Sequence, residues 1–197
     1  MRLGILGGTF DPVHYGHLVL AEEAREQLEL EQVLFVPAGQ PWRKAGRPVS
    51  PASHRLAMLR LAIEDNPAFE VAELELVRPG PSYSAETLAQ VQKENPAGEL
   101  YFIVGLDAWE DMPNWHEPER IVELATVVLA GRATLAGTPT PEREITGLRE
   151  NVHLLENRSI EISGTDIRQR VARGRSIRYL VPEAVRSYIA DNGLYAD

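Results

Sequence analysis

Six short apolar runs recur along the chain at the length of β-strands. In each run apolar residues follow one another instead of alternating with polar ones, which is typical of strands buried on both faces of a parallel sheet. The runs are Leu3–Leu6, Val33–Val36, Phe69–Val71, Tyr101–Val104, Thr126–Leu129 and Val152–Leu155. The pattern therefore predicts six inner parallel strands.

Stretches with helical signals separate most of these runs. They are Tyr15–Leu28, Ser53–Glu64, Ser84–Glu94 and Glu117–Leu124. Strands that alternate with helices indicate βαβ units and hence an α/β protein with a doubly wound parallel sheet.

The C-terminal part of the chain predicts helices without further strands. Ser163 is a good N-cap for a helix over Thr165–Ala172, which we expect to end at Gly174. A second helix is expected over Pro182–Asp191, with Asn192-Gly193 as its stop signal.

Two stretches rich in proline and glycine interrupt the alternation, Pro37–Pro51 and Gly131–Pro141. Long polar loops at such places are binding loops or lids, or else disordered connectors. The chain has 197 residues, enough for one substantial core, so we expect a single domain over residues 1–197.

Composition and net charge limit the kinds of molecule that the protein is expected to bind. The chain is 44% hydrophobic and 25% charged, as in ordinary folded proteins, and its net charge of −9 disfavours nucleic-acid binding by a broad basic surface. A local cationic site remains compatible with this charge. Candidate cations are Arg43, Lys44 and Arg47 in one group, and Arg168, Arg170, Arg173, Arg175 and Arg178 in another.

Several other classes of chemistry and location are disfavoured. Cysteine is absent, which excludes disulfides and a thiolate nucleophile. Only six residues precede Gly7, too few for a signal peptide, and no apolar run approaches the length of a membrane span. We therefore expect a cytoplasmic protein without membrane contact.

The string GGTFDPVHYGHL, from Gly7 to Leu18, predicts a phosphate-binding strand–loop–helix. Gly7 and Gly8 leave backbone N–H groups open to an anion, and the helix that starts near Tyr15 adds its positive end. His14 and His17 supply further donors and potential positive charge on its first turn. Ligands of open α/β sheets bind at the carboxyl ends of strands, where this string lies.

The same string disfavours two other kinds of site. It lacks the GKS or GKT of an ordinary P-loop, and His14 and His17 have no third protein ligand at a fixed spacing that would complete a zinc site. Two further histidines, His54 and His153, are expected to be structural.

The pair GGTFDPVHYGHL and ISGTDIR, the latter at Ile162–Arg168, resembles the signatures of the nucleotidyltransferase superfamily. RPGPSYSAETL at Arg78–Leu88, FIVGLDAW at Phe102–Trp109 and the later Trp115 resemble one branch, the bacterial nicotinate-nucleotide adenylyltransferases. The resemblance implies a Rossmann-like nucleotidyltransferase fold. It also implies transfer of AMP from ATP to nicotinic acid mononucleotide, with release of deamido-NAD and pyrophosphate.

The resemblance further implies which residues handle ATP. Those that would stabilise the phosphates during the reaction are His14, His17, Lys44 and Arg168. Further ATP contacts are implied for Gly7, Gly8, Thr9, Phe10, Gly105, Asp107, Ile162, Ser163 and Thr165. Mg²⁺ would accompany ATP and bridge its phosphates, without protein residues dedicated to the metal.

For the acceptor, the resemblance implies that Trp115 stacks on the pyridine ring and that backbone amides near Ser84 and His116 receive the carboxylate. N–H donors there would favour the acid over the amide. Arg132 matches a position near the acceptor phosphate. The remaining expected substrate contacts are Tyr83, Thr87 and Asp107.

The chain departs from the family pattern at two positions. Arg43 stands where many members have His before Lys44, and Gly164 stands where a second Ser is common. Both changes concern the contacts to ATP.

Four alternatives stay open. Phosphopantetheine adenylyltransferases share both motifs, but they are shorter and commonly have Thr at the position of His14; cytidylyltransferases are shorter still. A nucleotide sensor without turnover would be expected to lose His17 or Arg168, and both are present. A DNA-binding regulator would need a basic module, which we do not find. A homo-oligomer is left open.

Overall fold

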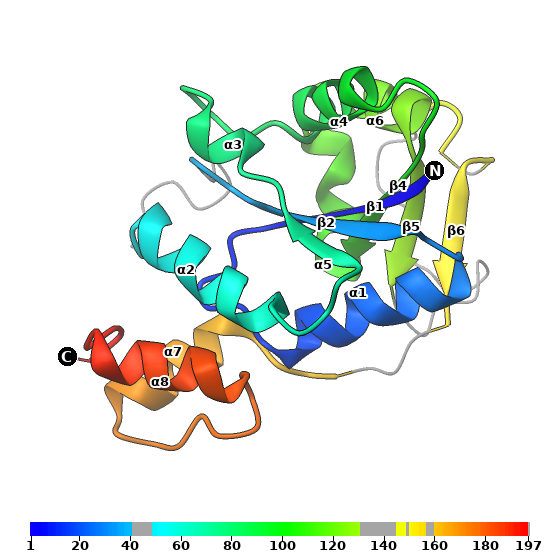
Figure 1. Cartoon of the computed structure of the whole chain (residues 1–197). Helices are drawn as coiled ribbons and strands as arrows, with labels where there is room; N and C mark the ends of the chain where they lie inside the picture. Colours follow the sequence, from blue (N-terminus) through cyan, green and yellow to red (C-terminus); the bar gives the residue numbers. More distant parts are fainter. Residues whose placement is uncertain (41–48, 131–144, 149, 157–159, 197) are drawn as a thin grey trace.

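The computed structural model describes residues 1–40, 49–130, 145–148, 150–156 and 160–196. Its centre is one parallel sheet, shown in Figure 1. The strands are β1 (Arg2–Gly8), β2 (Gln32–Pro37), β3 (Phe69–Val71), β4 (Glu99–Gly105), β5 (Thr126–Ala130) and β6 (Val152–Leu155). Their order is β3-β2-β1-β4-β5-β6, and every neighbouring pair is parallel. The predicted doubly wound parallel sheet is confirmed.

Two helical layers cover the sheet. Helices α1 (Tyr15–Gln27) and α2 (Ala52–Ile63) lie on one face, and α4 (Ser84–Glu94) and α6 (Pro118–Leu124) lie on the other (Figure 1). Because successive side chains of a strand point to opposite faces, Ile5 packs in the α4/α6 core and Leu6 in the α1/α2 core.

Helices α7 (Gly164–Ala172) and α8 (Glu183–Asp191) follow the sheet. Val185 and Ile189 of α8 join the core formed with α1 and α2, so the C-terminal segment is packed against the sheet domain. Gly174 and Gly193 have φ of 64° and 59°, the left-handed backbone that glycine adopts without strain, just past the ends of α7 and α8. Both predicted helix ends are confirmed.

The structure corrects two points of the strand and helix predictions. β3 and β6 were expected to be inner strands but form the two edges of the sheet, where Glu70 and His153 are exposed. Three short helices were missed, α3 (Leu74–Val77), α5 (Leu106–Asp111) and the 3₁₀ helix Met112–Asn114. Elements of three to six residues are too short to show a helical period.

The strand order creates a switch point between β1 and β4. The chain moves outward from β1 to β2 and β3, then returns to β1's other side and moves outward through β4, β5 and β6. Open α/β sheets usually bind their ligands in a crevice at such a switch point, where the loops at the carboxyl ends of the two strands diverge, so we expect the site there. Within the described ranges, no helix combines the length and apolar character that crossing a membrane requires.

Candidate active site

Glycines border the crevice at the ends of both central strands. Gly7 and Gly8 end β1, and Gly105 ends β4. A Cβ atom placed on Gly7 or on Gly105 would meet no atom of the described chain within 4 Å. The backbone of both strand ends is therefore open where a side chain would begin, which is compatible with the phosphate-binding prediction.

Phe10 supports the loop after β1 from within. It is buried, has φ of 50°, and packs its ring against Phe35 at a centroid distance of 5.9 Å. A Cβ on Gly8 would lie 3.0 Å from the Phe10 ring, which is tighter than ordinary contact. A glycine at position 8 therefore allows the backbone to pack closely on this ring. The buried Phe10 side chain in turn supports the conformation of the loop.

The two histidines form a stacked pair at the start of α1. Their ring centroids are 3.7 Å apart, and the backbone N–H of His14 donates to Nδ1 of His17 at 3.3 Å. Because Nδ1 accepts this bond, a neutral His17 carries its proton on Nε2. The edge of the His17 ring also meets Phe10 at 5.0 Å. His17 is therefore oriented as a hydrogen-bond donor.

His14 differs from His17 in its burial. Only 7% of its surface is exposed, and burial lowers its pKa to about 4. Its Nδ1 is buried and has no hydrogen-bond partner within the described part of the chain. His14 is therefore neutral near pH 7, so its ring does not supply the positive charge that the sequence suggested.

Helix α7 carries the ISGTDIR motif to the loop after β1. This loop, residues 9–14, is predicted to bind phosphate and is called the phosphate loop below. The Ser163 hydroxyl caps the helix by accepting from the N–H of Asp166 at 3.1 Å. Arg168 donates through Nη1 to the carbonyl oxygen of Asp11 at 2.6 Å and through Nη2 to Oγ1 of Thr165 at 3.2 Å. Arg168 and Asp11 are 157 positions apart in sequence, so this contact joins the two motifs.

Gly164 has a steric role in the same contact. A Cβ at this position would lie 2.8 Å from the carbonyl oxygen of Asp11 and 3.4 Å from Nη1 of Arg168. The departure from the family's serine therefore matches a close approach of α7 to the phosphate loop, which the sequence alone did not indicate.

Two of the residues expected to lie at the acceptor site contact each other. The rings of Tyr83 and His116 stack at 4.3 Å, which joins the start of α4 to the segment before α6. Trp115 is half-buried, donates from Nε1 to Oδ2 of Asp111 at 3.1 Å, and meets Phe102 edge-on at 6.2 Å. Asp107 is exposed on the first turn of α5.

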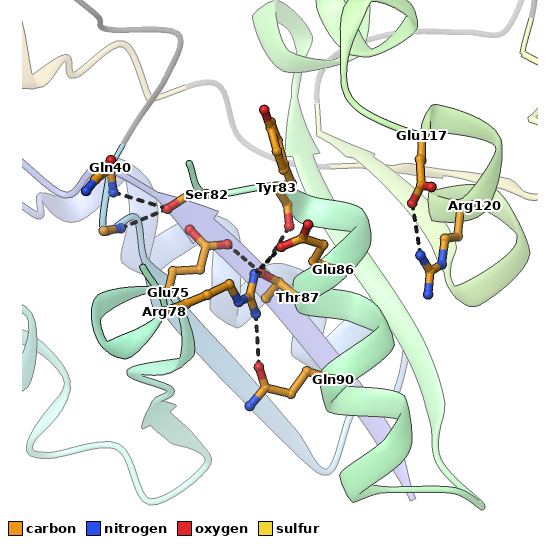
Figure 2. Close-up of polar contacts among 11 residues, drawn as sticks. Gln40, Glu75, Arg78, Ser82, Tyr83, Glu86, Thr87, Gln90, Glu117 and Arg120 are labelled. Atoms are coloured by element: carbon orange, nitrogen blue, oxygen red, sulfur yellow. Dashed lines mark hydrogen bonds and ion pairs between the residues drawn. The ribbon is translucent and has the colours of Figure 1, made fainter. Parts of the chain in front are cut away.

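A buried polar cluster supports the start of α4 (Figure 2). The Thr87 hydroxyl is 3% exposed and donates to Oε1 of Glu75 at 2.7 Å, while Nη2 of Arg78 donates to Oε1 of Gln90 at 2.9 Å. Thr87 was expected to touch the acceptor, but its side chain faces the protein interior. Burial raises the pKa of Glu75, and the hydrogen bond from Thr87 opposes this shift.

Ser82 links this cluster to the loop after β2. Its Oγ accepts from the backbone N–H groups of Gly39 at 3.0 Å and Gln40 at 3.3 Å. Sequence reasoning missed Glu75, Arg78 and Ser82 as supports of the site. The signal available was Glu75, a carboxylate between apolar neighbours in the string Leu74-Glu75-Leu76.

Some predicted residues cannot be placed. Arg43, Lys44, Arg47 and Arg132 lie outside the described residues. His54 binds the Tyr188 hydroxyl through Nδ1 at 3.0 Å, in line with the structural role predicted for it. In the described ranges, no group of three or more His, Cys, Asp or Glu side chains is arranged to hold a metal ion.

Fold and site together define a nucleotide-binding α/β protein with its ligand crevice at the β1/β4 switch point. The cytidylyltransferase-like family matches residues 5–170. Among curated relatives, a probable nicotinate-nucleotide adenylyltransferase of Thermomicrobium roseum is 48% identical over 98% of this chain and 91% of its own length. One of the same name from a Roseiflexus species is 50% identical over 98% of this chain and 97% of its own length.

A solved structure shows the same fold. It is the Plasmodium falciparum nicotinic acid mononucleotide adenylyltransferase complexed with NaAD, with a TM-score of 0.77, 18% identity, and coverage of 98% of this chain and 97% of that one. The chain belongs to the cytidylyltransferase-like family and, within it, to the nicotinate-nucleotide adenylyltransferases.

Proposed function

We propose that this chain transfers the adenylyl group of ATP to nicotinic acid mononucleotide, forming deamido-NAD and pyrophosphate. The observation that carries the proposal is the hydrogen bond from Arg168 to Asp11, which brings the two motifs together at the crevice. The names of relatives at 48% and 50% identity support the choice of substrates.

The reaction needs alignment and charge stabilisation more than an enzyme nucleophile. A phosphate oxygen of the acceptor attacks the α-phosphorus of ATP, and the bond from that phosphorus to the oxygen bridging to the β-phosphate breaks, releasing pyrophosphate. His17 would donate from Nε2 to the phosphates, and Arg168 retains donors beyond the two in use. Lys44 is proposed to add positive charge.

Mg²⁺ enters this proposal as part of the substrate. The described residues include no cluster of acidic and histidine side chains that would hold a metal ion by themselves. The triphosphate supplies the oxygen ligands that Mg²⁺ prefers. We propose that the oxygens of the triphosphate would hold Mg²⁺ and that the ion would supply positive charge to these phosphates.

The acceptor side is proposed to read a carboxylate. Tyr83 precedes α4 and does not cap it with its side chain, so the first backbone N–H groups of the helix are proposed to donate to the carboxylate. Trp115 would stack on the pyridine ring. Nicotinamide would place an NH₂ group against the same N–H donors, which weakens its binding.

Pyrophosphate release from Mg-ATP tests this function. Nicotinic acid mononucleotide, nicotinamide mononucleotide and 4′-phosphopantetheine are supplied side by side as acceptors. We expect rapid release with the acid and far slower release with its amide. Release with phosphopantetheine alone would assign the chain to that other branch, and no release with any acceptor would indicate a sensor without turnover.

A further inference from the structure

Asp11 binds three separate segments of the chain. Its side chain is only 6% exposed, with Oδ1 accepting from the Tyr195 hydroxyl at 2.6 Å and Oδ2 accepting from the backbone N–H of Ser50 at 3.2 Å. Its backbone carbonyl accepts from Arg168. One residue of the phosphate loop is therefore tied to the C-terminus, to the start of α2 and to α7.

Arg55 completes this buried cluster. It is 2% exposed and donates to the carbonyl oxygens of Thr9 at 2.8 Å and Ser50 at 3.0 Å. Burial lowers the pKa of Arg55, and the nearby Asp11 carboxylate opposes that shift. A buried carboxylate is costly unless it is paired and hydrogen-bonded, so each partner of Asp11 stabilises its position.

Tyr195 reaches Asp11 from the far end of the sequence, 184 positions away. It follows α8, adopts a left-handed backbone with φ of 64°, and directs its hydroxyl inward. Burial, followed by the contact with Asp11, raises the pKa of Tyr195, so the phenol keeps its proton and donates it. The function proposed above gives Tyr195 no part.

We infer that Tyr195 is a positioning residue for ATP, because its hydroxyl holds the Asp11 carboxylate and thereby the phosphate loop and the anchor of Arg168. This inference rests on the proposed function, since it needs the loop to bind ATP phosphates. Without the hydroxyl, Oδ1 of Asp11 is left without this donor in a buried place. The side chain would rotate toward its remaining partners and displace the loop backbone.

The variant Tyr195→Phe tests the inference with little change of shape. Binding of α,β-methylene-ATP is measured by calorimetry, and KM for each substrate is measured in the assay of pyrophosphate release. We expect ATP-analogue affinity to fall about 3- to 10-fold, as one hydrogen bond to a charged group allows, while KM for the acceptor stays unchanged.

Tyr188→Phe is the matched control. It removes a tyrosine hydroxyl from α8 that contacts His54 instead of the phosphate loop. Both KM values should stay at the wild-type level in this variant. Comparing thermal unfolding of the two variants shows how much of any effect is loss of folding.

Asp11→Asn provides a second arm, through its combination with Tyr195→Phe in a double variant. If the hydroxyl acts through Asp11, the double variant should bind the analogue no more weakly than Asp11→Asn alone. Independent, additive losses would overturn the inference, as would wild-type analogue affinity in a folded Tyr195→Phe protein. A wild-type chain that binds no analogue would contradict the proposed function itself.

Discussion

The stacked rings of His14 and His17 have different surroundings, which give the two side chains different properties. His17 is fixed as an Nε2 donor by the backbone N–H of His14, whereas the His14 ring is buried and neutral. The sequence predicted both histidines as phosphate ligands from their place before a helix. The lowered pKa of His14 could not be predicted, because it depends on burial in the folded chain.

Burial of His14 makes the free energy of unfolding depend on pH. Its pKa is about 4 in the folded protein against an ordinary 6.5, so below pH 6.5 the unfolded chain takes up the proton more readily. Stability from this residue is present above pH 6.5 and is lost as the pH falls to 4, on the order of 3 kcal/mol in all. Urea unfolding at pH 7.5 and pH 5 should show this loss.

The variant His14→Asn should lose less stability between those two pH values than the wild type. His153→Asn, at an exposed position of β6, serves as the control and should behave like the wild type. An identical pH dependence in wild type and His14→Asn would show that His14 is not the group responsible.

His17 is expected to act mainly in the transition state. Loss of one donor to developing charge costs about 10²-fold in turnover, so His17→Ala should lower kcat by roughly that factor. Steady-state rates at saturating substrate, with thermal unfolding to verify folding, measure the effect. Near-normal kcat in a folded variant would remove His17 from the mechanism.

Trp115 is expected to act on the acceptor alone. Stacking of an aromatic side chain on a base is worth about 1–3 kcal/mol, so Trp115→Ala should raise the acceptor KM by roughly 5- to 160-fold and leave the ATP KM unchanged. The contact with Asp111 also orients the indole, which makes Asp111→Asn a milder variant of the same test. An unchanged acceptor KM would assign Trp115 to packing.

At the level of elements, long segments were predicted well and short ones were not. The helix over Ser84–Glu94 and the strand Val152–Leu155 have the predicted bounds, because several turns or an uninterrupted apolar run give a clear signal. The helix Leu106–Asp111 was missed, since six residues carry little periodicity. Edge strands were mistaken for inner ones because apolar runs do not reveal which strands have two neighbours.

The approach of α7 to the phosphate loop gives a prediction for Gly164. A Cβ there would lie 2.8 Å from a backbone oxygen that also accepts from Arg168, so Gly164→Ala must displace one element from the other. We expect a loss of about 1–3 kcal/mol in the free energy of unfolding and a raised KM for ATP. Gly7→Ala, where a Cβ meets open space, is the control for stability.

Wild-type unfolding and ATP KM in Gly164→Ala would mean that α7 can move away without consequence. Gly164→Ser adds a further check, since serine is the residue that the family commonly has here. If serine restores function that alanine loses, its hydroxyl compensates for the displacement.

For the whole molecule, the strand order determines where the predicted site lies. Sequence patterns predicted a doubly wound sheet and put the first motif at a strand end, but the order β3-β2-β1-β4-β5-β6 emerged only from the structure. The contact of Tyr195 with Asp11 likewise has no local signal, because it joins residues 184 positions apart. The motifs predicted the class of reaction, whereas the long-range contacts that position the site residues had no signal in the sequence.

Following the α-phosphorus of ATP into the products tests adenylyl transfer to nicotinic acid mononucleotide. The chain is incubated with Mg-ATP labelled at the α-phosphorus and with nicotinic acid mononucleotide, and the products are separated. Adenylyl transfer predicts that the label appears in deamido-NAD, with one pyrophosphate released for each dinucleotide formed. Label found only in AMP or left in ATP would contradict adenylyl transfer to this acceptor.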